Sequence, residues 1–196
     1  MGAAGCSALR RSYNVPMERD IERILISRKC ISERVSALAD SIGETYGADS
    51  EGLVIVPILA GSVIFLADLI RCLPFKMKIG LMTVSSYRGK TTSAGESRLI
   101  QDLNLDIEDR HVLVVDDILD TGSTLRLVVG ELRQRRPASV RICVLLRKRS
   151  KAPRDFSVDF VGFDIEDVFV VGYGLDYNDH YRNWPDIGVL KPELYE

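Results

Sequence analysis

The chain has 196 residues, of which 46% are hydrophobic and 28% charged, and its formal net charge is −2. This length can bury one substantial core, so we expect a single domain over residues 15–196. The near-neutral charge gives no long-range attraction for nucleic acid or anionic lipid, and no hydrophobic run reaches the roughly 20 residues of a membrane span. We therefore expect neither nucleic acid nor a membrane as a partner.

Residues 1–14 and the cysteines indicate a cytoplasmic protein. The N-terminal segment lacks the hydrophobic run of a signal peptide, and we expect it to be disordered, as many termini are. The four cysteines are widely spaced and form no CxxC pair, and the chain has only two histidines, so a zinc site is not expected. Widely spaced, unpaired cysteines fit a reducing compartment.

The start of the chain predicts a strand followed by a helix. Residues 21–26 alternate like a short strand, and Ser27 then offers an N-cap for a helix that ends at Gly47. Hydrophobic residues recur at helical spacing in this helix, at Ile31, Val35, Leu38, Ala39 and Ile42.

A second strand and helix follow. Residues 53–59 (LVIVPIL) form a hydrophobic run typical of a strand buried on both faces, although Pro57 cannot donate a ladder hydrogen bond. Residues 63–73 predict a helix that Pro74 terminates. Residues 76–86 alternate like one continuous strand. The side chains predicted on one side of it are Met77, Ile79, Leu81 and Thr83.

The rest of the chain continues the alternation of strands and helices. Residues 87–97 are polar and contain glycine, which is typical of a loop, and residues 98–103 are extended. Residues 111–115 (HVLVV) predict a buried strand, and residues 125–136 predict a helix. Further strands are expected at 140–146, 158–163 and 169–172. This order favours an α/β protein with a mainly parallel sheet.

The strongest functional signal is the segment 114–124, VVDDILDTGST, which joins the 111–115 strand to the following helix. Two carboxylates, Asp116 and Asp117, stand where the strand is expected to end. The tight turn after them consists of Asp120, Thr121, Gly122, Ser123 and Thr124. Successive amides at such a turn form an anion cradle, and its glycine lets a phosphate approach the backbone closely.

Helix capping is the simpler explanation of this turn, because Asp and Thr commonly precede helices and a DTG triplet alone is a weak signal. Capping does not require Asp116 and Asp117, whereas a ligand with a phosphate and sugar hydroxyls uses both features. The GxxxxGK[ST] pattern of nucleotide triphosphatases is absent, so ATP hydrolysis is not expected. The segment therefore predicts a sugar-phosphate site at the carboxyl edge of a parallel sheet.

The same segment resembles the signature of the type I phosphoribosyltransferases: a buried strand, two acidic residues, two hydrophobic residues and then DTGxT. The resemblance extends from about residue 21 onward, and segments 145–150 (LLRKRS) and 169–182 (FVVGYGLDYNDHYR) are most similar to the members that act on hypoxanthine and guanine. It implies a twisted, mainly parallel sheet flanked by helices, with a small hood subdomain formed from both chain ends. It also implies purine salvage, in which hypoxanthine, and also guanine, displaces pyrophosphate from 5-phosphoribosyl-1-pyrophosphate with Mg²⁺.

The resemblance assigns the phosphoribosyl site to the segment 114–124. The turn from Asp120 to Thr124 would hold the 5′-phosphate, and Asp116 and Asp117 would contact the ribose hydroxyls and the metal. Asp120 would act as the general base that takes a proton from N7 of the purine.

The resemblance places pyrophosphate at Ala60, Gly61 and Arg182. Ala60 stands where many relatives have a lysine, so this loop would offer only backbone contacts. In the family the peptide bond between the residues equivalent to Ala60 and Gly61 can be cis. From the residues alone, the segment is equally well explained as an ordinary strand-to-helix turn.

The purine site is implied by the distal segments. Lys148 would donate to the exocyclic oxygen of a 6-oxopurine, which disfavours adenine because its amino group is itself a donor. Phe169 would stack on the ring, and backbone carbonyls near Val170 and Asp176 would accept from the amino group of guanine. Asp176 would also orient a water-bearing Mg²⁺. Without the family, Lys148 would be interpreted as solvated and Phe169 as a core residue.

Ser86 and Tyr87 begin the polar loop, which in relatives closes over the ligands. The family also implies a homodimer or homotetramer. Two other functions stay open: a phosphoribosyltransferase for xanthine or adenine, and a non-catalytic regulator that senses 5-phosphoribosyl-1-pyrophosphate. The regulator is disfavoured because the chain retains Asp120, Lys148, Phe169 and Asp176.

Overall fold

A seven-stranded sheet forms the centre of the computed structural model, which describes residues 16–47, 52–86, 97–101 and 103–195. The strand order is β5-β4-β2-β6-β7-β8, with β3 pairing beside β2. All neighbouring strands are parallel except β4 and β5. The principal strands are β2 (Val54–Leu59), β4 (Met82–Ser86), β5 (Ser97–Gln101), β6 (His111–Leu119), β7 (Ser139–Lys148) and β8 (Phe160–Ile165). The predicted mainly parallel α/β sheet is confirmed.

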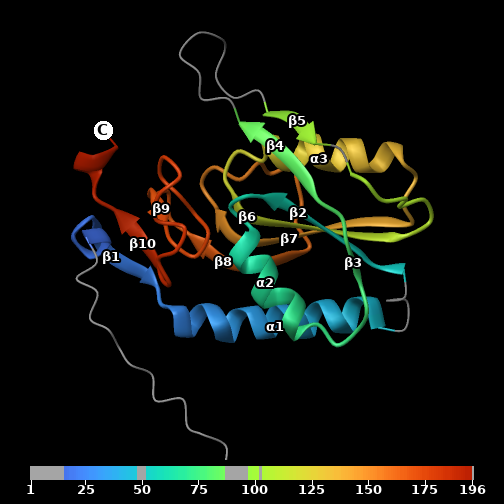
Figure 1. Cartoon of the computed structure of the whole chain (residues 1–196), viewed down its shortest axis with the longest axis horizontal. Helices are drawn as coiled ribbons and strands as arrows, with labels where there is room; N and C mark the ends of the chain where they lie inside the picture. The colour runs from blue at the N-terminus through green and yellow to red at the C-terminus, as the bar shows by residue number, and fades with distance from the viewer. Residues whose placement is uncertain (1–15, 48–51, 87–96, 102, 196) are drawn as a thin grey trace, which may run out of the picture.

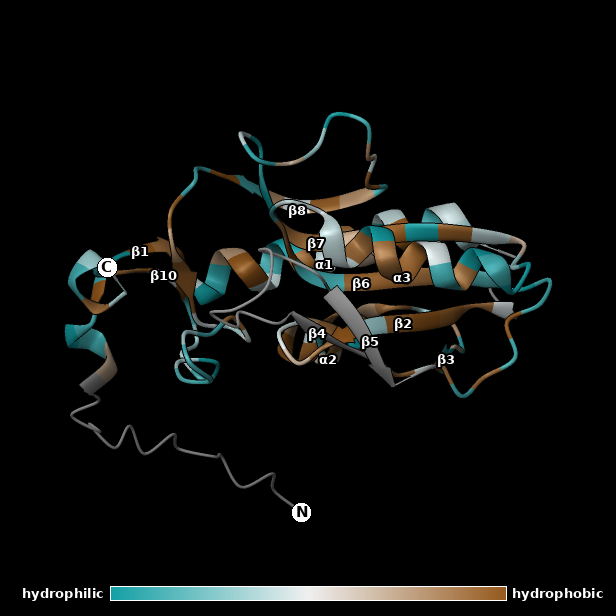
Figure 2. Cartoon of the chain, turned by 90° about the horizontal axis from the view of Figure 1, so that it is seen from above, coloured by the Kyte–Doolittle hydropathy of each residue, from teal (hydrophilic) through white to brown (hydrophobic). Residues whose placement is uncertain are grey.

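Helices cover both faces of this main sheet (Figure 1). The helices are α1 (Arg28–Tyr46), α2 (Val63–Cys72) and α3 (Ser123–Gln134). Alternate residues of the central strands join different hydrophobic clusters: Ile55 packs in the cluster of α1 and α2, whereas Val54 and Val56 pack in the cluster of α3. A strand covered on both faces needs hydrophobic residues throughout, which explains the unbroken runs in the sequence and the hydrophobic strands in Figure 2.

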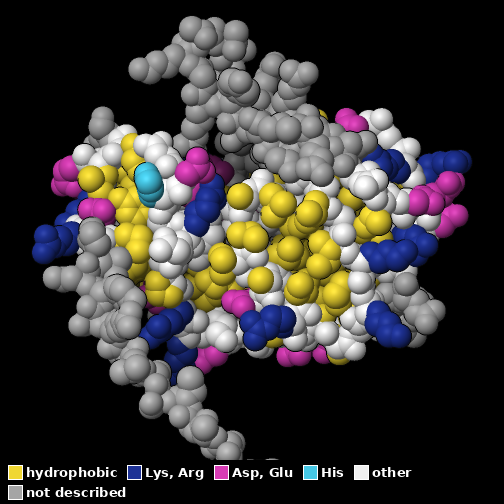
Figure 3. Space-filling view, viewed as in Figure 1, with side chains coloured by type: hydrophobic (Ala, Val, Ile, Leu, Met, Phe, Trp, Pro, Cys, Tyr) yellow, Lys and Arg dark blue, Asp and Glu magenta, His cyan; other side chains and the backbone are white. Residues whose placement is uncertain are grey.

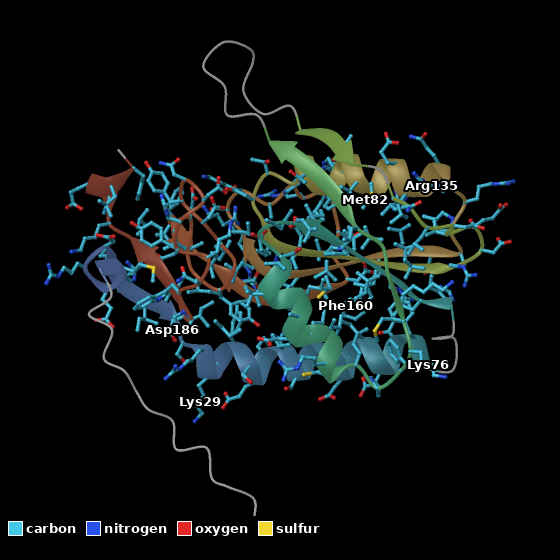
Figure 4. The ribbon with its side chains drawn as sticks, in the orientation of Figure 1. Lys29, Lys76, Met82, Arg135, Phe160 and Asp186 are labelled. Atoms are coloured by element: carbon cyan, nitrogen blue, oxygen red, sulfur yellow. The ribbon has the colours of Figure 1, made fainter. Side chains whose placement is uncertain are left out.

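The ends of α1 follow the predicted signals. The Oγ of Ser27 accepts a hydrogen bond from the amide of Cys30 at 3.3 Å, and Gly47, with φ of +41°, ends the helix. Asp186 adds a contact from near the other end of the chain, because its Oδ1 accepts from the amide of Arg28 at 2.6 Å. Figure 4 shows Asp186 beside the start of α1.

The predicted continuous strand over residues 76–86 is wrong. The structure has two strands there, β3 (Lys78–Ile79) and β4 (Met82–Ser86), with a break between them. Of the side chains predicted on one side of that strand, Ile79 and Leu81 are 41% and 45% exposed, whereas Met82 is buried.

Pro57 accounts for this break. On the β3 side of β2, the carbonyls of Leu53 and Ile55 accept hydrogen bonds from the amides of Lys78 and Gly80 at 3.0 and 2.9 Å. Strand alternation directs the nitrogen of Pro57 to the same side, where it has no hydrogen to donate. The ladder is therefore interrupted at the level of the proline, which explains how Pro57 is accommodated in a central strand.

A second, antiparallel sheet has the order β1-β10-β9 and lies at one end of the main sheet (Figure 1). Its strands are β1 (Ile21–Ile26), β9 (Val170–Val171) and β10 (Ile187–Leu190). We call these strands and segment 172–186 the hood. Short 3₁₀ helices, η1 (Pro16–Arg19) and η3 (Pro192–Leu194), flank it. The hood joins both chain ends, as the resemblance implies, but the sequence predicts no strand at β10.

Two of the predictions fall outside the described residues, namely the state of residues 1–14 and the position of Tyr87. Of the helices in the described part of the chain, none combines the length and the hydrophobicity that a bilayer crossing requires. The predicted site lies at the edge of the main sheet that faces the hood.

Candidate active site

A cavity of about 610 Å³ opens at the carboxyl ends of β2, β6 and β7. This is the edge where open parallel sheets bind ligands. The cavity is lined by Ile58, Leu59, Ala60, Gly61, Asp116, Asp117, Ile118, Asp120, Thr121, Gly122, Ser123, Thr124, Leu125, Lys148, Lys151, Phe169, Val170, Leu175, Asp176 and Arg182. All the residues predicted for the purine, phosphoribosyl and pyrophosphate sites line it. Ser86 is the last residue of β4, and Tyr87 lies outside the described residues.

The turn between β6 and α3 leaves its amides available. Gly122 has φ of +76° and ψ of 3°, a left-handed conformation that glycine adopts without steric cost. Within the described residues, the amides of Thr121, Gly122 and Ser123 donate to no protein acceptor. The positive end of the α3 dipole lies at the same place. The turn is therefore a suitable cradle for a phosphate.

Asp116 and Asp117 lie inside β6 and not beyond its end. Pairing with β7 continues as far as Leu119 opposite Arg147, so the prediction that the strand ends before the carboxylates is wrong. The longer partner strand, which runs to Lys148, provides the hydrogen bonds that extend β6. The acid pair is consequently held on a rigid strand.

The acid pair has Asp116 buried and Asp117 half-buried, and the proximity of two like charges is electrostatically unfavourable. The Oδ1 of Asp116 accepts a hydrogen bond from the amide of Asp117 at 3.0 Å. Burial, and next the negative charge of Asp117, raise the pKa of Asp116 well above its ordinary value. Burial also raises the pKa of Asp117. Hydroxyl groups or a cation from a ligand would replace the water that these carboxylates have lost.

Asp120 and Lys148 form a second polar pair in the cavity. The Nζ of Lys148 lies 3.6 Å from Oδ2 of Asp120, and Oδ1 of Asp120 is buried with no hydrogen-bond partner among the described residues. The lysine side chain is only 9% exposed. Its neighbours Arg147 and Arg149 both pair with Asp164 instead, as the alternation of side chains along a strand requires. The site thus presents an ammonium donor beside an unpartnered carboxylate oxygen.

Phe169 lies just before β9 and has one ring face covered. The ring of Tyr195 stacks on it at a centroid distance of 4.7 Å and an angle of 24°, and Tyr177 contacts it edge-on at 5.6 Å. Val170, the first residue of β9, is buried beside it. A planar ligand in the cavity could stack on Phe169 while Tyr195 supports the ring.

Arg182 and Asp176 contact one another. The Nη1 of Arg182 lies 3.0 Å from Oδ1 of Asp176 and donates to the carbonyl of Gly174 at 2.9 Å, and Nη2 donates to Asp179 at 3.0 Å. The Oδ2 of Asp176 accepts from the amide of Asp179 at 2.9 Å. The guanidinium also lowers the pKa of Asp117, although the effect of burial is larger. Arg182 is therefore braced by the hood at the rim of the cavity.

Gly61 is a point of close approach, as predicted. A Cβ at this position would overlap Oδ2 of Asp117, and a Cβ on Gly174 would overlap the carbonyl oxygen of Gly61. A cis peptide bond lies between Leu59 and Ala60, one bond before the position implied by the resemblance. The acidic strand, the loop after β2 and the hood therefore meet at Gly61.

Three residues near the cavity are missing from the sequence prediction. Lys151 lines the cavity, and Oδ1 of Asp167 contacts Nζ of both Lys148 and Lys151, at 3.0 and 2.9 Å. Tyr195 stacks on Phe169. Lys151 belongs to the same basic run as Lys148 and could have been found from it. Asp167 and Tyr195 have no local signal, because only the folded chain brings them to the site.

Comparison with protein families identifies the class. Residues 25–178 match the family model described as the phosphoribosyl transferase domain. The chain therefore belongs to the phosphoribosyltransferase family, and its fold is the type I fold of that family.

Individual relatives are more specific. The chain is 44% identical over 180 residues to the hypoxanthine-guanine phosphoribosyltransferase of Bacillus subtilis, an alignment that covers 92% of this chain and 99% of the relative. A hypoxanthine phosphoribosyltransferase structure from Staphylococcus aureus superposes with a TM-score of 0.86 at 41% identity, covering 94% and 99% of the two chains. A structure named as a hypoxanthine-guanine-xanthine phosphoribosyltransferase is 36% identical, with a TM-score of 0.78 and coverage of 88% and 99%.

Proposed function

We propose that this chain transfers the phosphoribosyl group of 5-phosphoribosyl-1-pyrophosphate to hypoxanthine, and to guanine, in purine salvage. One observation carries the proposal: a single cavity combines an anion cradle, an acid pair in which Asp116 is buried, and a buried lysine beside a carboxylate oxygen that has no hydrogen-bond partner among the described residues. A ligand pair of sugar phosphate and oxopurine uses all three. We also propose that residues 15–196 act as one domain, because the cavity is lined by residues from Ile58 to Arg182.

The phosphoribosyl donor would lie along β6 and the turn after it. The amides and hydroxyls of Asp120 to Thr124 would hold the 5′-phosphate. Asp116 and Asp117 would accept from the ribose hydroxyls. Positive charge develops on the ribose as its bond to pyrophosphate breaks, and carboxylates fixed beside the sugar stabilise that charge.

Asp120 would take the proton that the purine loses. A ring nitrogen of the purine forms the new bond to the anomeric carbon while the bond to the pyrophosphate oxygen breaks. The proton on N7 then needs an acceptor, and the unpartnered Oδ1 of Asp120 is available.

Lys148 would select a 6-oxopurine. Its ammonium can only donate, so it matches the exocyclic oxygen of hypoxanthine or guanine and opposes the amino group of adenine. A buried donor left without a partner costs about 1–3 kcal/mol, which gives the selectivity a physical basis. Phe169 would stack on the ring, and carbonyls near Val170 and Asp176 would accept from the amino group of guanine.

Pyrophosphate would be held by the backbone of Ala60 and Gly61 and by Arg182. A guanidinium has five N–H donors, and the contacts of Arg182 to the hood use three of them, so two stay available for an anion. Because Ala60 has no charged side chain, the remaining neutralisation has to come from elsewhere.

Mg²⁺ fits this donor set. The described residues contain no cluster of three or more His, Cys, Asp or Glu that could enclose an ion. Magnesium usually binds through one or two carboxylates together with waters and substrate phosphates, so an enclosing cluster is not required. Asp176, with Asp116 and Asp117, offers oxygen ligands of this kind. A bound Mg²⁺ would neutralise charge on the leaving pyrophosphate.

Xanthine is the second candidate acceptor, because Lys148 would recognise the 6-oxygen that xanthine shares with hypoxanthine.

We also propose self-association into a homodimer or homotetramer. Hydrophobic side chains gather over the α2 face in Figure 3, and Val63, Ile64, Ile79 and Leu81 are exposed in this part of the chain. Sedimentation velocity tests the assembly, and a purely monomeric species would refute it.

The decisive experiment is a spectrophotometric assay with the phosphoribosyl donor, Mg²⁺ and hypoxanthine, guanine, xanthine or adenine in turn. We expect turnover with hypoxanthine and guanine and none with adenine. The Lys148→Ala variant should lose the preference for 6-oxopurines. Tight binding of the donor without turnover on any purine would instead support the regulator.

A further inference from the structure

Asp167 holds two lysines of the site in place. It lies in the turn between β8 and β9, and its Oδ1 contacts Nζ of Lys148 at 3.0 Å and Nζ of Lys151 at 2.9 Å. A turn at the end of β7, in which the carbonyl of Lys148 accepts from the amides of Lys151 and Ala152 at 3.1 and 2.8 Å, brings the second lysine back beside the first. Two ammonium groups therefore share one carboxylate oxygen.

The arrangement is electrically balanced. Two ammonium groups, on Lys148 and Lys151, face two carboxylates, on Asp120 and Asp167. Hydrogen bonds from Lys151 and then Lys148 lower the pKa of Asp167, which favours its charged form. The side chain of Lys148 is only 9% exposed, so ion pairing with these carboxylates replaces most of its contact with water.

The position of Lys148 depends on which carboxylate attracts it more. Its Nζ lies 3.0 Å from Asp167 and 3.6 Å from Asp120. Without Asp167, the only remaining carboxylate within 4 Å of Nζ in the described residues is Asp120. The ammonium would then move toward Oδ2 of Asp120, the carboxylate proposed as the base, and would leave the 6-oxygen of the purine.

We infer that Asp167 is a positioning residue for purine recognition: it draws Lys148 away from Asp120 and holds its ammonium where the 6-oxygen of the purine binds. This inference rests on the proposed function. A plain surface ion pair is the alternative, since the side chain of Asp167 is 39% exposed and such pairs contribute little to stability. The alternative predicts no effect on catalysis.

The test compares Asp167→Asn with Asp164→Asn by steady-state kinetics. Asp164 is a matched control, because it pairs with Arg147 and Arg149, the residues on either side of Lys148, away from the cavity. For Asp167→Asn we expect KM for hypoxanthine to rise about tenfold and kcat to fall, with KM for the phosphoribosyl donor unchanged. The control should keep both KM values. Asp167→Glu retains the carboxylate and should restore most of the hypoxanthine affinity.

The two proposals fail differently. If the wild-type chain turns over no 6-oxopurine, the proposed function is wrong. If the wild-type chain is active and Asp167→Asn matches Asp164→Asn, or if both of its KM values rise together and Asp167→Glu gives no rescue, Asp167 has only a structural role. Thermal unfolding of the variants provides the folding control, and within the described residues the side chain of Asp167 accepts from no backbone amide.

Discussion

The sheet edge and the hood form two sides of one cavity by different means. Three polar or charged residues are buried in the described part of the chain, and all three, Ser62, Asp116 and Lys148, lie at the carboxyl edge of the main sheet. The hood instead joins the main core through buried hydrophobic residues, among them Val170, Leu175 and Ile187, and the hydroxyl of Tyr173 donates a part-buried hydrogen bond to Asp68 at 2.7 Å.

This difference separates chemistry from positioning. Burying charge costs folding free energy, and a rigid parallel sheet with two hydrophobic layers can tolerate that cost where a ligand will bind. The described residues of the hood carry no such cost, because the side chains that they bury are hydrophobic or aromatic, and they act by holding rings and backbone in place. Substitutions of charged residues at the sheet edge should therefore lower activity and raise stability. Substitutions in the hood should change ligand affinity with little gain in stability.

The largest effect should follow from Asp120→Asn. The amide keeps the size of the side chain but cannot accept the proton, so kcat should fall by about 10²–10⁴-fold. The affinity for the phosphoribosyl donor, measured by calorimetry, should stay within about twofold, because the amides of the turn are unchanged. A rate near that of the wild type would show that Asp120 is not the general base, and the sheet edge would then have no assigned base.

Gly61→Ala tests whether the loop after β2 and the acid pair on β6 really meet at this residue. The added methyl group overlaps Oδ2 of Asp117, so either the acid or the loop must shift. We expect KM for the phosphoribosyl donor to rise by about tenfold or more, by analogy with the loss of one charge-assisted hydrogen bond. The matched control is Gly130→Ala on α3, where an added Cβ meets nothing within 4 Å. Its helix propensity should improve stability by up to about 1 kcal/mol with unchanged kinetics. Equal kinetics in the two variants would show that the contact at Gly61 has no functional weight.

Asp116→Asn should expose the stability cost of the sheet edge. Burial raises the pKa of Asp116, so its contribution to stability is present at low pH and is lost as the pH rises through that raised pKa. At neutral pH the neutral amide removes the penalty and can still accept from the amide of Asp117. Without ligands, we expect Tm to rise by about 2–4 °C for each kcal/mol of penalty removed, and donor affinity to fall.

The pH dependence of this variant supplies the check. The difference in Tm between Asp116→Asn and the wild type should shrink as the pH falls, because the wild-type carboxyl then becomes protonated. Thermal unfolding across the acid range measures it. A variant less stable than the wild type at neutral pH would show that Asp116 contributes more through its charge than its burial costs.

The main sheet and its acidic turn could be predicted from sequence because their signals are local. The hydrophobic runs, the caps of α1 and the segment 114–124 each report burial or turn geometry within a few residues. The exact ends of the strands depend on partner strands that are distant in sequence. β6 extends past Asp116 because β7 continues beside it, and residues 76–86 divide because Pro57 on another strand interrupts their pairing.

The hood and its contacts were harder to predict for the same physical reason. β10 is short, and it is a strand because β1, from the opposite end of the chain, and β9 pair with it. Asp167 and Tyr195 lie in segments without periodicity, and their partners are distant in sequence. Hydrophobic periodicity reports which side of an element is buried, and it carries no information about which distant residue lies opposite.

The smallest expected effect is at Tyr195, which follows η3 beside the hood. Its ring stacks on Phe169 at 4.7 Å, so removing it in Tyr195→Ala frees Phe169 to turn and weakens the platform for the purine. Aromatic pairs contribute about 0.5–1.5 kcal/mol, which corresponds to a rise in KM for hypoxanthine of roughly two- to tenfold. The donor KM and Tm should change little, because Tyr195 contacts neither the turn nor the acid pair. Tyr195→Phe keeps the stack and should behave like the wild type. If Tyr195→Ala instead raises the KM values of both substrates equally, the hood does not act through the purine alone, and the division between a chemical sheet edge and a positioning hood is too simple.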